Sequence, residues 1–383
     1  MDRPLKILML NYEFPPIGGG GGNAHRHLLT EYAKQDNLHI DVLTSSPQPG
    51  HSTESFSENI TIYKVGIHKK NLHYWRKTEV LEWLFKANRK LKTMLAENQY
   101  DLAHAFFGFP TGWLTYRHRH KLPYIISLRG SDVPGFNLRL KLDYHLLKGL
   151  FHKIWQNADA VIANSKGLAE LAVKFEPSLD IGVICNGIDT KKFTPPLNRV
   201  LVDRIKLLTV CRLIARKRIH LLIEAVHHLK QQGIDTELNI VGEGNLLNEL
   251  QTQARQLRIN DHVNFLGLVG YEEMPSVYQQ NHLFLMSSVH EGMSNAMLEA
   301  MASGLPILST ACEGTQELIT DNGIIVSEPT SENIAEAIIH AAKDQQKYAQ
   351  MSVASRKIAE KFSWSNTANQ YLQLYATFKS FCR

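Results

Sequence analysis

The sequence predicts an α/β protein of two domains, each built on a parallel sheet. Short apolar runs alternate with segments of helical spacing along the whole chain, a pattern typical of βαβ units. The 383 residues exceed one ordinary core and suit two domains of roughly 150–200 residues each. The alternation stops once, at the proline pair Pro195-Pro196, and then starts again.

The predicted strands fall into two sets, one on each side of the proline pair. The first set is Leu5–Leu10, His39–Thr44, Tyr124–Leu128, Ala160–Ala163 and Gly182–Cys185, and the second lies within 206–213, 237–244, 262–269, 282–288 and 305–310. We therefore expect an N-terminal domain over residues 1–196 and a C-terminal domain over 197–362. Because ligands bind beyond the carboxyl ends of parallel strands, two such domains facing each other would place their loops across a shared cleft.

A glycine run, Gly18 to Gly22, separates the first strand from the first helical segment. A dinucleotide site is disfavoured, because Asn23 stands where a third glycine or alanine is needed and the second strand ends without an acid. A flexible linker is a poor alternative between the strand and the helix of one unit. Backbone N–H groups at a helix N-terminus that meet an anion or a sugar are the interpretation we favour.

The segment 290–310, HEGMSNAMLEAMASGLPILST, contains a short capped helix. Ser294 can cap a helix over 295–302, and Gly304 and Pro306 can end it.

The backbone N–H groups of Gly292, Met293 and Ser294 would form an anion site at the positive end of this helix. Glu291 and Glu299 are eight residues apart, so their backbones would lie roughly 10–12 Å apart. That separation is too large for an acid and base acting on one bond, and it suits the two ends of a long ligand. A capped core helix with incidental surface acids is the alternative.

Cations follow the first strand of the second domain, at Arg212 and at Arg216-Lys217-Arg218. They could neutralise a diphosphate, or they could form a solvated face. Gly242-Glu243-Gly244 joins a strand to a helix, where the backbone could approach a flat base and Glu243 could accept from it. An ordinary turn is the alternative there.

Composition and charge limit the cellular location that the sequence predicts. Charged residues make up 21% and hydrophobic residues 44%, no apolar run approaches the roughly 18 residues that cross a membrane, and the N-terminus is predicted to be a strand rather than a signal peptide. No spacing among Cys185, Cys211, Cys312 and Cys382 suggests a metal or a disulfide framework. A cytoplasmic protein is therefore expected.

The positive charge is concentrated in the first half. Residues 1–196 hold 25 Lys and Arg against 18 Asp and Glu, and the remainder hold 17 against 19. The segment 68–92 has eight cations against two acids, and a second basic, apolar segment spans 139–153. Interleaved aromatics in the first segment, Tyr74, Trp75, Trp83 and Phe85, suit contact with an anionic membrane. Solvated helix faces are the alternative, and no motif for nucleic acid is present.

Taken together, these segments resemble the retaining glycosyltransferases of family 4, which have the GT-B architecture of two facing Rossmann-like domains. The likeness covers essentially the whole chain. It includes 11–33, 185–195, 211–225, 241–250 and above all the E-x₇-E run EGMSNAMLE. It implies metal-independent, cofactor-free transfer of a sugar from a UDP- or GDP-sugar donor to a hydroxyl of a glycan or lipid-linked acceptor. With the basic segments 68–92 and 139–153, the hypothesis for the setting is surface polysaccharide or glycolipid synthesis, on the inner face of a membrane.

The resemblance implies roles for the matching residues. Glu291 would contact the donor sugar near the reacting carbon, residues 292–294 would hold phosphate and sugar, and Glu299 would hold the ribose hydroxyls. Arg212 and Lys217 match the family's diphosphate-binding pair and would stabilise the leaving nucleoside diphosphate.

In the first domain, the resemblance implies that Gly19 and Gly20 close over phosphate and acceptor. Arg129 stands where many members have the histidine of a His-Gly-x-Asp run, and arginine cannot act as a general base. It could instead bind a phosphate or an acidic sugar. Further cleft candidates are Asp132, Asn164 and Asn186, and helix capping is the alternative for Asn164-Ser165.

Two other functions stay open: an isomerase like the nucleotide-sugar 2-epimerases, and a non-catalytic nucleotide-binding relative. The chain lacks the Asp-x-Asp pair of metal-dependent transferases, and no carboxylate is placed as a nucleophile, so attack on the same face as the leaving phosphate is the hypothesis for retention. A C-terminal helix over 363–383 is expected to pack back on the first domain.

Overall fold

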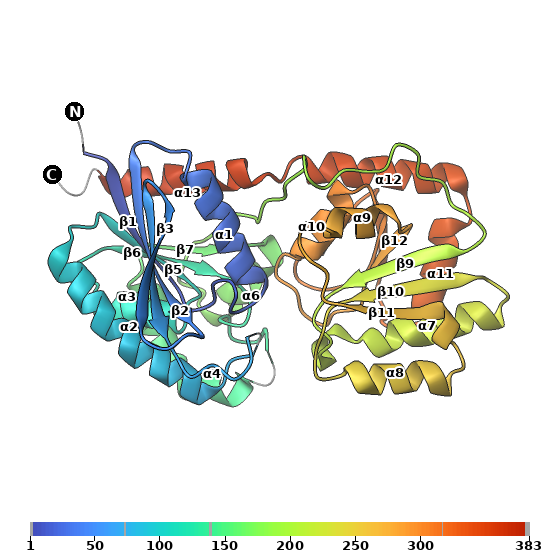
Figure 1. The fold of residues 1–383 in the computed structure, drawn as a ribbon, viewed down its shortest axis with the longest axis horizontal. Coiled ribbons are helices and arrows are strands. Elements are labelled where there is room, and N and C mark those ends of the chain that lie inside the picture. The colour runs from blue at the N-terminus through green and yellow to red at the C-terminus, as the bar shows by residue number, and fades with distance from the viewer. Residues whose placement is uncertain (1–2, 73, 138–139, 316, 380–383) are drawn as a thin grey trace. The chain divides into compact units, whose positions relative to one another are not determined.

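The computed structural model describes residues 3–72, 74–137, 140–315 and 317–379, which form two compact units (Figure 1). Unit 1 runs up to Asn186 and resumes at Trp364, and unit 2 comprises Gly187–Ser363. The first boundary therefore lies ten residues before the expected one at 196/197.

Packing explains why the linker belongs to unit 2. Phe193 is fully buried, and its ring lies 5.8 Å from that of Tyr278. The Arg356 guanidinium donates to the carbonyl oxygens of Phe193 and Thr190 at 2.8 and 3.1 Å. The proline pair lies beyond these contacts, so it marks a local break in secondary structure rather than the edge of a core.

The sheet of unit 1 has eight strands in the order β3-β4-β2-β1-β5-β6-β7-β8, parallel except for the β3–β4 pair. Their bounds are β1 Leu5–Asn11, β2 Leu38–Ser46, β3 His51–Ser57, β4 Ile60–Gly66, β5 Leu102–Phe106, β6 Tyr124–Leu128, β7 Ala160–Ala163 and β8 Ile181–Val183. The chain adds strands to one side of β1 and then, from β5, to the other. The loops after β1 and β5 thus lie at the switch point of the sheet, where ligands bind in this fold class.

The helices of unit 1 are α1 Gly20–Tyr32, α2 Lys77–Glu97, α3 Thr111–Arg117, α4 Lys141–Leu146, α5 Lys148–Gln156, α6 Lys166–Phe175 and α13 Trp364–Lys379. The last belongs to this unit although unit 2 precedes it in sequence. A buried hydrogen-bond chain fixes α13 to the sheet. The Tyr375 hydroxyl lies 2.6 Å from His104 Nδ1, and Ser127 Oγ lies 2.6 Å from His104 Nε2 and 2.8 Å from the Tyr371 hydroxyl.

The sheet of unit 2 has six parallel strands in the order β11-β10-β9-β12-β13-β14. Their bounds are β9 Ile205–Val210, β10 Thr236–Val241, β11 Val263–Gly267, β12 Leu283–Met286, β13 Ile307–Thr310 and β14 Gly323–Val326. The accompanying helices and 3₁₀ turns are η2 Ala215–Lys217, α7 Ile219–Gln231, α8 Leu247–Gln256, η3 Asn260–His262, α9 Met274–Gln279, α10 Asn295–Ala302, α11 Ser331–Ala342 and α12 Gln345–Ala359. Here the switch point lies between β9 and β12.

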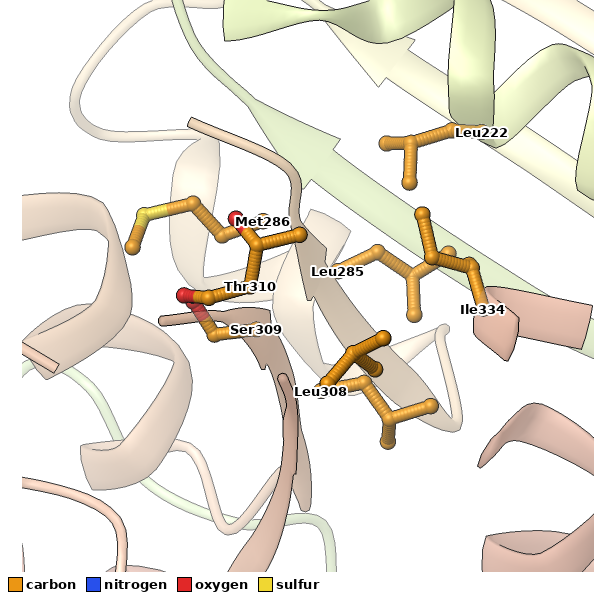
Figure 2. A pocket seen from close by; sticks show the side chains of 8 residues that line it. Leu222, Leu285, Met286, Leu308, Ser309, Thr310 and Ile334 are labelled. Carbon is orange, nitrogen blue, oxygen red and sulfur yellow. The ribbon is translucent and has the colours of Figure 1, made fainter. Parts of the chain in front are cut away.

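A small apolar hollow remains in the core of unit 2, where α7 and α11 pack on the sheet (Figure 2). It is lined by Leu222, Leu285, Met286, Leu308, Ser309, Thr310, Val326 and Ile334. Because the lining is mostly aliphatic, the hollow is a packing gap and offers little to a polar ligand.

Candidate active site

The helix predicted in the segment 290–310 is confirmed. α10 spans Asn295–Ala302, and the Ser294 hydroxyl caps it by accepting from the Met297 N–H at 3.3 Å. Gly304, with φ of 72°, follows the last turn. The cap leaves the backbone N–H groups before α10 at its positive end, immediately after β12 and at the switch point of the sheet.

Glu291 and Lys217 form an ion pair beside this helix. Their side chains are only 13% and 12% exposed, respectively, so the pair is shielded from water. The Ser288 hydroxyl also donates to Glu291 Oε1, at 3.1 Å. Burial lowers the pKa of Lys217 to about 8, with the neighbouring arginine charges as a smaller cause. The two residues predicted to act on donor sugar and diphosphate are therefore in direct contact.

Two loops are joined to make that contact. The Val289 N–H donates to the Arg216 carbonyl oxygen at 2.9 Å, and the Ser287 hydroxyl donates to the Lys217 carbonyl oxygen at 2.7 Å. Arg218, whose φ of 48° is left-handed, donates through Nε to the Ser287 carbonyl oxygen at 3.0 Å. The cation cluster is thus divided in function, because Arg218 holds the loops together and Lys217 points to the site.

Arg212 leaves the end of β9 with an exposed side chain. It lies on the same edge of the sheet as Lys217, as predicted for residues that follow this strand.

Glu299 lies on α10, where the Tyr278 hydroxyl donates to its Oε2 at 2.7 Å. Burial raises the pKa of Glu299 to about 7, although the hydrogen bond from Tyr278 and the charge of Lys192 act in the opposite direction. Because its pKa lies near 7, this carboxyl group ionises around neutral pH. The ionised form can accept hydrogen bonds from the hydroxyl groups of a ligand. Tyr278, on α9, was not predicted, since nothing in its local sequence connects it with a residue 21 positions away.

Glycine is required at positions 242 and 244 because other backbone atoms of the chain lie too close for a side chain. A Cβ at Gly242, where φ is 128°, would lie 2.0 Å from the Cys211 carbonyl oxygen, and one at Gly244 would lie 2.2 Å from that of Leu213. The close approach is therefore to the backbone after β9. The Glu243 side chain is exposed at this edge.

The loop after β13 supplies residues that sequence reasoning missed. Gly314 N–H donates to the Glu291 carbonyl oxygen at 2.9 Å. The Glu313 carboxylate accepts from the Glu291 N–H at 3.3 Å and lies 2.6 Å from His290 Nδ1. The position of this loop after the predicted strand 305–310 was the available signal.

In unit 1, the glycine run opens α1, with Gly19 at the N-cap. A Cβ at Gly21 would lie 2.7 Å from the Phe107 ring, and one at Gly22 would lie 2.8 Å from a carbonyl oxygen of the preceding loop. A Cβ at Gly19 would meet no atom within 4 Å. Packing therefore explains why glycine is needed at positions 21 and 22. It does not explain the glycine at position 19, which lies with Gly20 at the start of α1.

Arg129 follows β6, and its Nη1 donates to Asn186 Oδ1 at 2.8 Å. The guanidinium carbon lies 4.7 Å from the centre of the Phe106 ring. Nε and Nη2 are buried without a hydrogen-bond partner. Asn164, which follows β7, also has a buried side-chain oxygen without a partner. Arg129, Asn164 and Asn186 are thus three polar residues of unit 1. The side chains of Arg129 and Asn164 each have buried atoms without a hydrogen-bond partner.

Asp132 has a different role. It is 2% exposed, and its carboxylate accepts backbone N–H groups of Gly108, Arg129 and Gly130 at 2.7–2.9 Å. Burial raises the pKa of this carboxyl in spite of those bonds. The structure therefore gives Asp132 the task of shaping the loop that carries Arg129.

The basic segment 68–92 divides between core and surface. Trp83 is fully buried, Trp75 is half-buried, and the buried Lys69 ammonium pairs with the Glu79 carboxylate at 2.7 Å. These side chains do not belong to an exposed face. Tyr74 and Phe85 do, with 61% and 75% of their surfaces exposed. His73 and Arg139, which fall in the two basic segments, lie outside the described residues.

Comparison with known proteins decides the family. The model described as Glycosyltransferase Family 4 matches residues 19–192, and that described as Glycosyl transferases group 1 matches residues 194–358. The chain belongs to glycosyltransferase family 4. The resemblance seen in the sequence is thereby confirmed, and membership of this family supports a glycosyltransferase.

Two relatives in the family cover 97% and 58% of the chain. A glycosyltransferase of Methanocaldococcus jannaschii, MJ1607, is 26% identical over 97% of this chain and 98% of its own length. LpsE of Rhizobium meliloti, a glycosyltransferase of lipopolysaccharide core biosynthesis, is 30% identical over 58% of this chain and 66% of its own.

Solved structures confirm the GT-B fold. Sucrose-phosphate synthase of Thermosynechococcus elongatus superposes with a TM-score of 0.84 at 20% identity, covering 98% of this chain and 99% of that one. HepE of Anabaena, crystallised with UDP-glucose, superposes with a TM-score of 0.75 at 19% identity, covering 97% of this chain and 100% of that one. Within residues 3–72, 74–137, 140–315 and 317–379, no helix is long and apolar enough to span a bilayer.

Proposed function

We propose that this glycosyltransferase moves a sugar from a UDP- or GDP-sugar to a hydroxyl group of a glycan or lipid-linked acceptor, with retention of configuration and without a metal. The observation that carries the proposal is the grouping in unit 2 of the α10 N-terminus, the Lys217–Glu291 pair and Glu299 at one switch point. A positive helix end beside a lysine suits a pyrophosphate, and a carboxyl group one turn or more along the helix suits a ribose.

The chemistry assigned to these residues is charge stabilisation. The bond between the anomeric carbon and the β-phosphate oxygen breaks, and the acceptor oxygen bonds to that carbon on the same face. The acceptor proton passes to the leaving phosphate oxygen. Lys217, Arg212 and the N–H groups of residues 292–294 would stabilise the negative charge that grows on the diphosphate. Since these groups supply the positive charge, we propose that no metal ion is needed.

The relatives support particular substrates. HepE binds UDP-glucose, so uridine is the first base to test. LpsE acts in lipopolysaccharide core biosynthesis, which supports a glycan acceptor in a surface polysaccharide or glycolipid.

A binding and turnover panel tests the proposal. UDP, GDP and their glucose and mannose conjugates would be tested by thermal shift with EDTA present. A ligand at 100 times its Kd should stabilise the protein by about 2.7 kcal/mol. Lys217→Met should abolish the shift, whereas the exposed control Lys191→Met should keep it.

Several outcomes would contradict the proposal. They are a panel without any shift, turnover that stops in EDTA and returns with Mn²⁺, an anomeric configuration inverted in the product, or an epimer formed from the donor without acceptor. A glycosyl-enzyme adduct in mass spectrometry would contradict same-face attack alone.

We also propose that unit 1 contacts an anionic membrane surface, on the inner face of the membrane. On α2, Leu81 and Phe85 are 64% and 75% exposed, and on α4, Leu142 and Leu146 are 66% and 71% exposed. The Lys77 ammonium pairs with Asp143 at 2.6 Å, so these two helices are tied together. Exposed apolar side chains among cations suit an interface with acidic lipid.

Vesicle flotation tests the membrane contact. The protein should float with vesicles containing phosphatidylglycerol and not with pure phosphatidylcholine. Phe85→Ser combined with Leu146→Ser should reduce flotation at least threefold, whereas Val353→Ser, an exposed apolar position in unit 2, should not. Absence of binding at low salt would refute this contact without affecting the transferase proposal.

A further inference from the structure

The unpaired edge of the Arg129 guanidinium indicates the kind of sugar that unit 1 receives. Nη1 is engaged by Asn186, whereas Nε and Nη2 are buried without a partner. The Nε–H and Nη2–H bonds point the same way from one edge of the planar group. That edge is the fork which binds both oxygens of a carboxylate or phosphate. The side of Arg129 left unpaired is therefore the side suited to an anion.

The surroundings do not neutralise this charge. Among the described residues, no carboxylate forms an ion pair with the Arg129 guanidinium. The oxygens of Asp132 accept three backbone N–H groups instead. His25 and His104 are fully buried, and burial, followed by the charge of Arg129, lowers the pKa of each imidazole, so both are neutral near pH 7. A partly buried cation without a counter-ion is unfavourable, and a bound anion would offset that cost.

A second unsatisfied group lies on the neighbouring strand. Leu128 and Ala163 are register partners in β6 and β7, so Arg129 and Asn164 leave adjacent strands at the same level. Asn164 is 5% exposed, and its Oδ1 has no hydrogen-bond partner. This oxygen can accept a hydroxyl proton, and buried polar atoms left open in this way call for a ligand or water. An anion fork next to a hydroxyl acceptor fits a sugar that carries an acidic group.

We propose that unit 1 recognises a carboxylate or phosphate carried by the sugar substrate, with Arg129 Nε and Nη2 binding two of its oxygens and Asn164 accepting from a hydroxyl of the same sugar. The inference rests on the proposed glycosyl transfer and narrows its substrate to a uronic acid or a sugar phosphate. A neutral hexose would leave the guanidinium edge unpaired, so the site should discriminate against it.

Binding to the full chain tests this inference in two arms. In the donor arm, UDP-glucuronic acid is compared with UDP-glucose by calorimetry. In the acceptor arm, glucuronate and glucose 6-phosphate are compared with glucose by ligand-observed NMR in the presence of UDP. At least one charged sugar should bind about tenfold or more tightly than its neutral counterpart, and the arm in which it does so identifies whether donor or acceptor carries the charge.

Substitutions of Arg129 distinguish the paired N–H groups of its guanidinium from its charge alone and from an effect on protein stability. Arg129→Gln should abolish the preference, Arg129→Lys should keep only part of it because lysine lacks the fork, and the exposed control Arg117→Gln should keep all of it. All three should bind UDP as the wild type does, which shows that they are folded.

Equal binding of charged and neutral sugars, or a preference that persists in Arg129→Gln, would overturn the inference and leave the transferase proposal intact. Loss of UDP binding in Arg129→Gln and Arg129→Lys, with both variants folded by circular dichroism, would assign the guanidinium to the donor diphosphate and overturn it too. If UDP-glucose and UDP both fail to bind the wild type, the proposed function fails first.

Discussion

The ionisation of Glu299 should control nucleotide binding. Burial raises the pKa of this carboxyl from its ordinary value of 4.5 to about 7. A carboxylate that accepts the hydroxyl protons of a ribose must be ionised, so donor binding below pH 7 should release a proton. UDP-glucose is the ligand of choice, because its phosphate diester does not titrate in this range.

The magnitude follows from the pKa. At pH 5.5 only roughly 3% of Glu299 would be ionised, against about three quarters at pH 7.5, so the affinity for UDP-glucose should rise about 25-fold between these values. Above pH 8 the affinity should fall again, because the Lys217 ammonium has a pKa of about 8. Calorimetry at pH 6 in two buffers of different ionisation enthalpy should show close to one proton released for each donor bound.

The same shift predicts a change in stability without ligand. The folded state binds the Glu299 proton more tightly than the unfolded chain does, so this group's contribution to stability is complete below pH 4.5 and is lost as the pH rises through 7. Relative to Glu299→Gln, the free energy of unfolding of the wild type should therefore fall by about 2 kcal/mol between pH 5 and pH 7.5. Urea titrations measure it, and Glu336→Gln, an exposed acid on α11, is the control. A pH profile of affinity unchanged in Glu299→Gln, or no proton release, would refute the reasoning.

Three further perturbations test other parts of the structure. Gly19→Ala should keep the thermal midpoint and lower turnover at least tenfold. Gly21→Ala should instead lower the midpoint, because its Cβ would meet the Phe107 ring at 2.7 Å. A fully active Gly19→Ala variant would exclude close approach of a ligand to residue 19. Tyr375→Phe should cost about 2 kcal/mol in urea unfolding, because it leaves a buried imidazole nitrogen without its partner; an unchanged midpoint would show that α13 is held by apolar packing alone. Leu285→Ala should cost about 3 kcal/mol, since it enlarges the hollow of Figure 2, and a loss below 1 kcal/mol would indicate that the core collapses into the space.

Local features of the fold were predictable because their causes lie within a few residues. The Ser294 cap, the periodicity of 295–302 and the glycine after it determine α10 at the predicted bounds. The strands at 124–128 and 160–163 were also found as predicted. β5, Leu102–Phe106, was not predicted, although it is wholly buried beside β1. Its five residues include a histidine, and only the tertiary hydrogen bonds of His104 make that residue compatible with a core.

The division of the basic segment 68–92 shows the limit of composition. Eight cations and four aromatic residues suggested one exposed face, yet Trp83 and Lys69 face inward. Charge and aromaticity are properties of residues, whereas exposure depends on the side of the helix that packs on the sheet.

The sequence by itself determined that this is a two-domain α/β transferase and which segments hold its polar and glycine residues, because periodicity, caps and motifs act over short spans of chain. Only the tertiary structure decided that Lys217 pairs with Glu291 across 74 positions, and that one edge of Arg129 stays unpaired. It also decided that Gly242 is glycine because the Cys211 carbonyl oxygen lies too close for a side chain. These facts depend on strand order and register, which bring distant loops to the same edge of a sheet and set the burial and pKa of each side chain there.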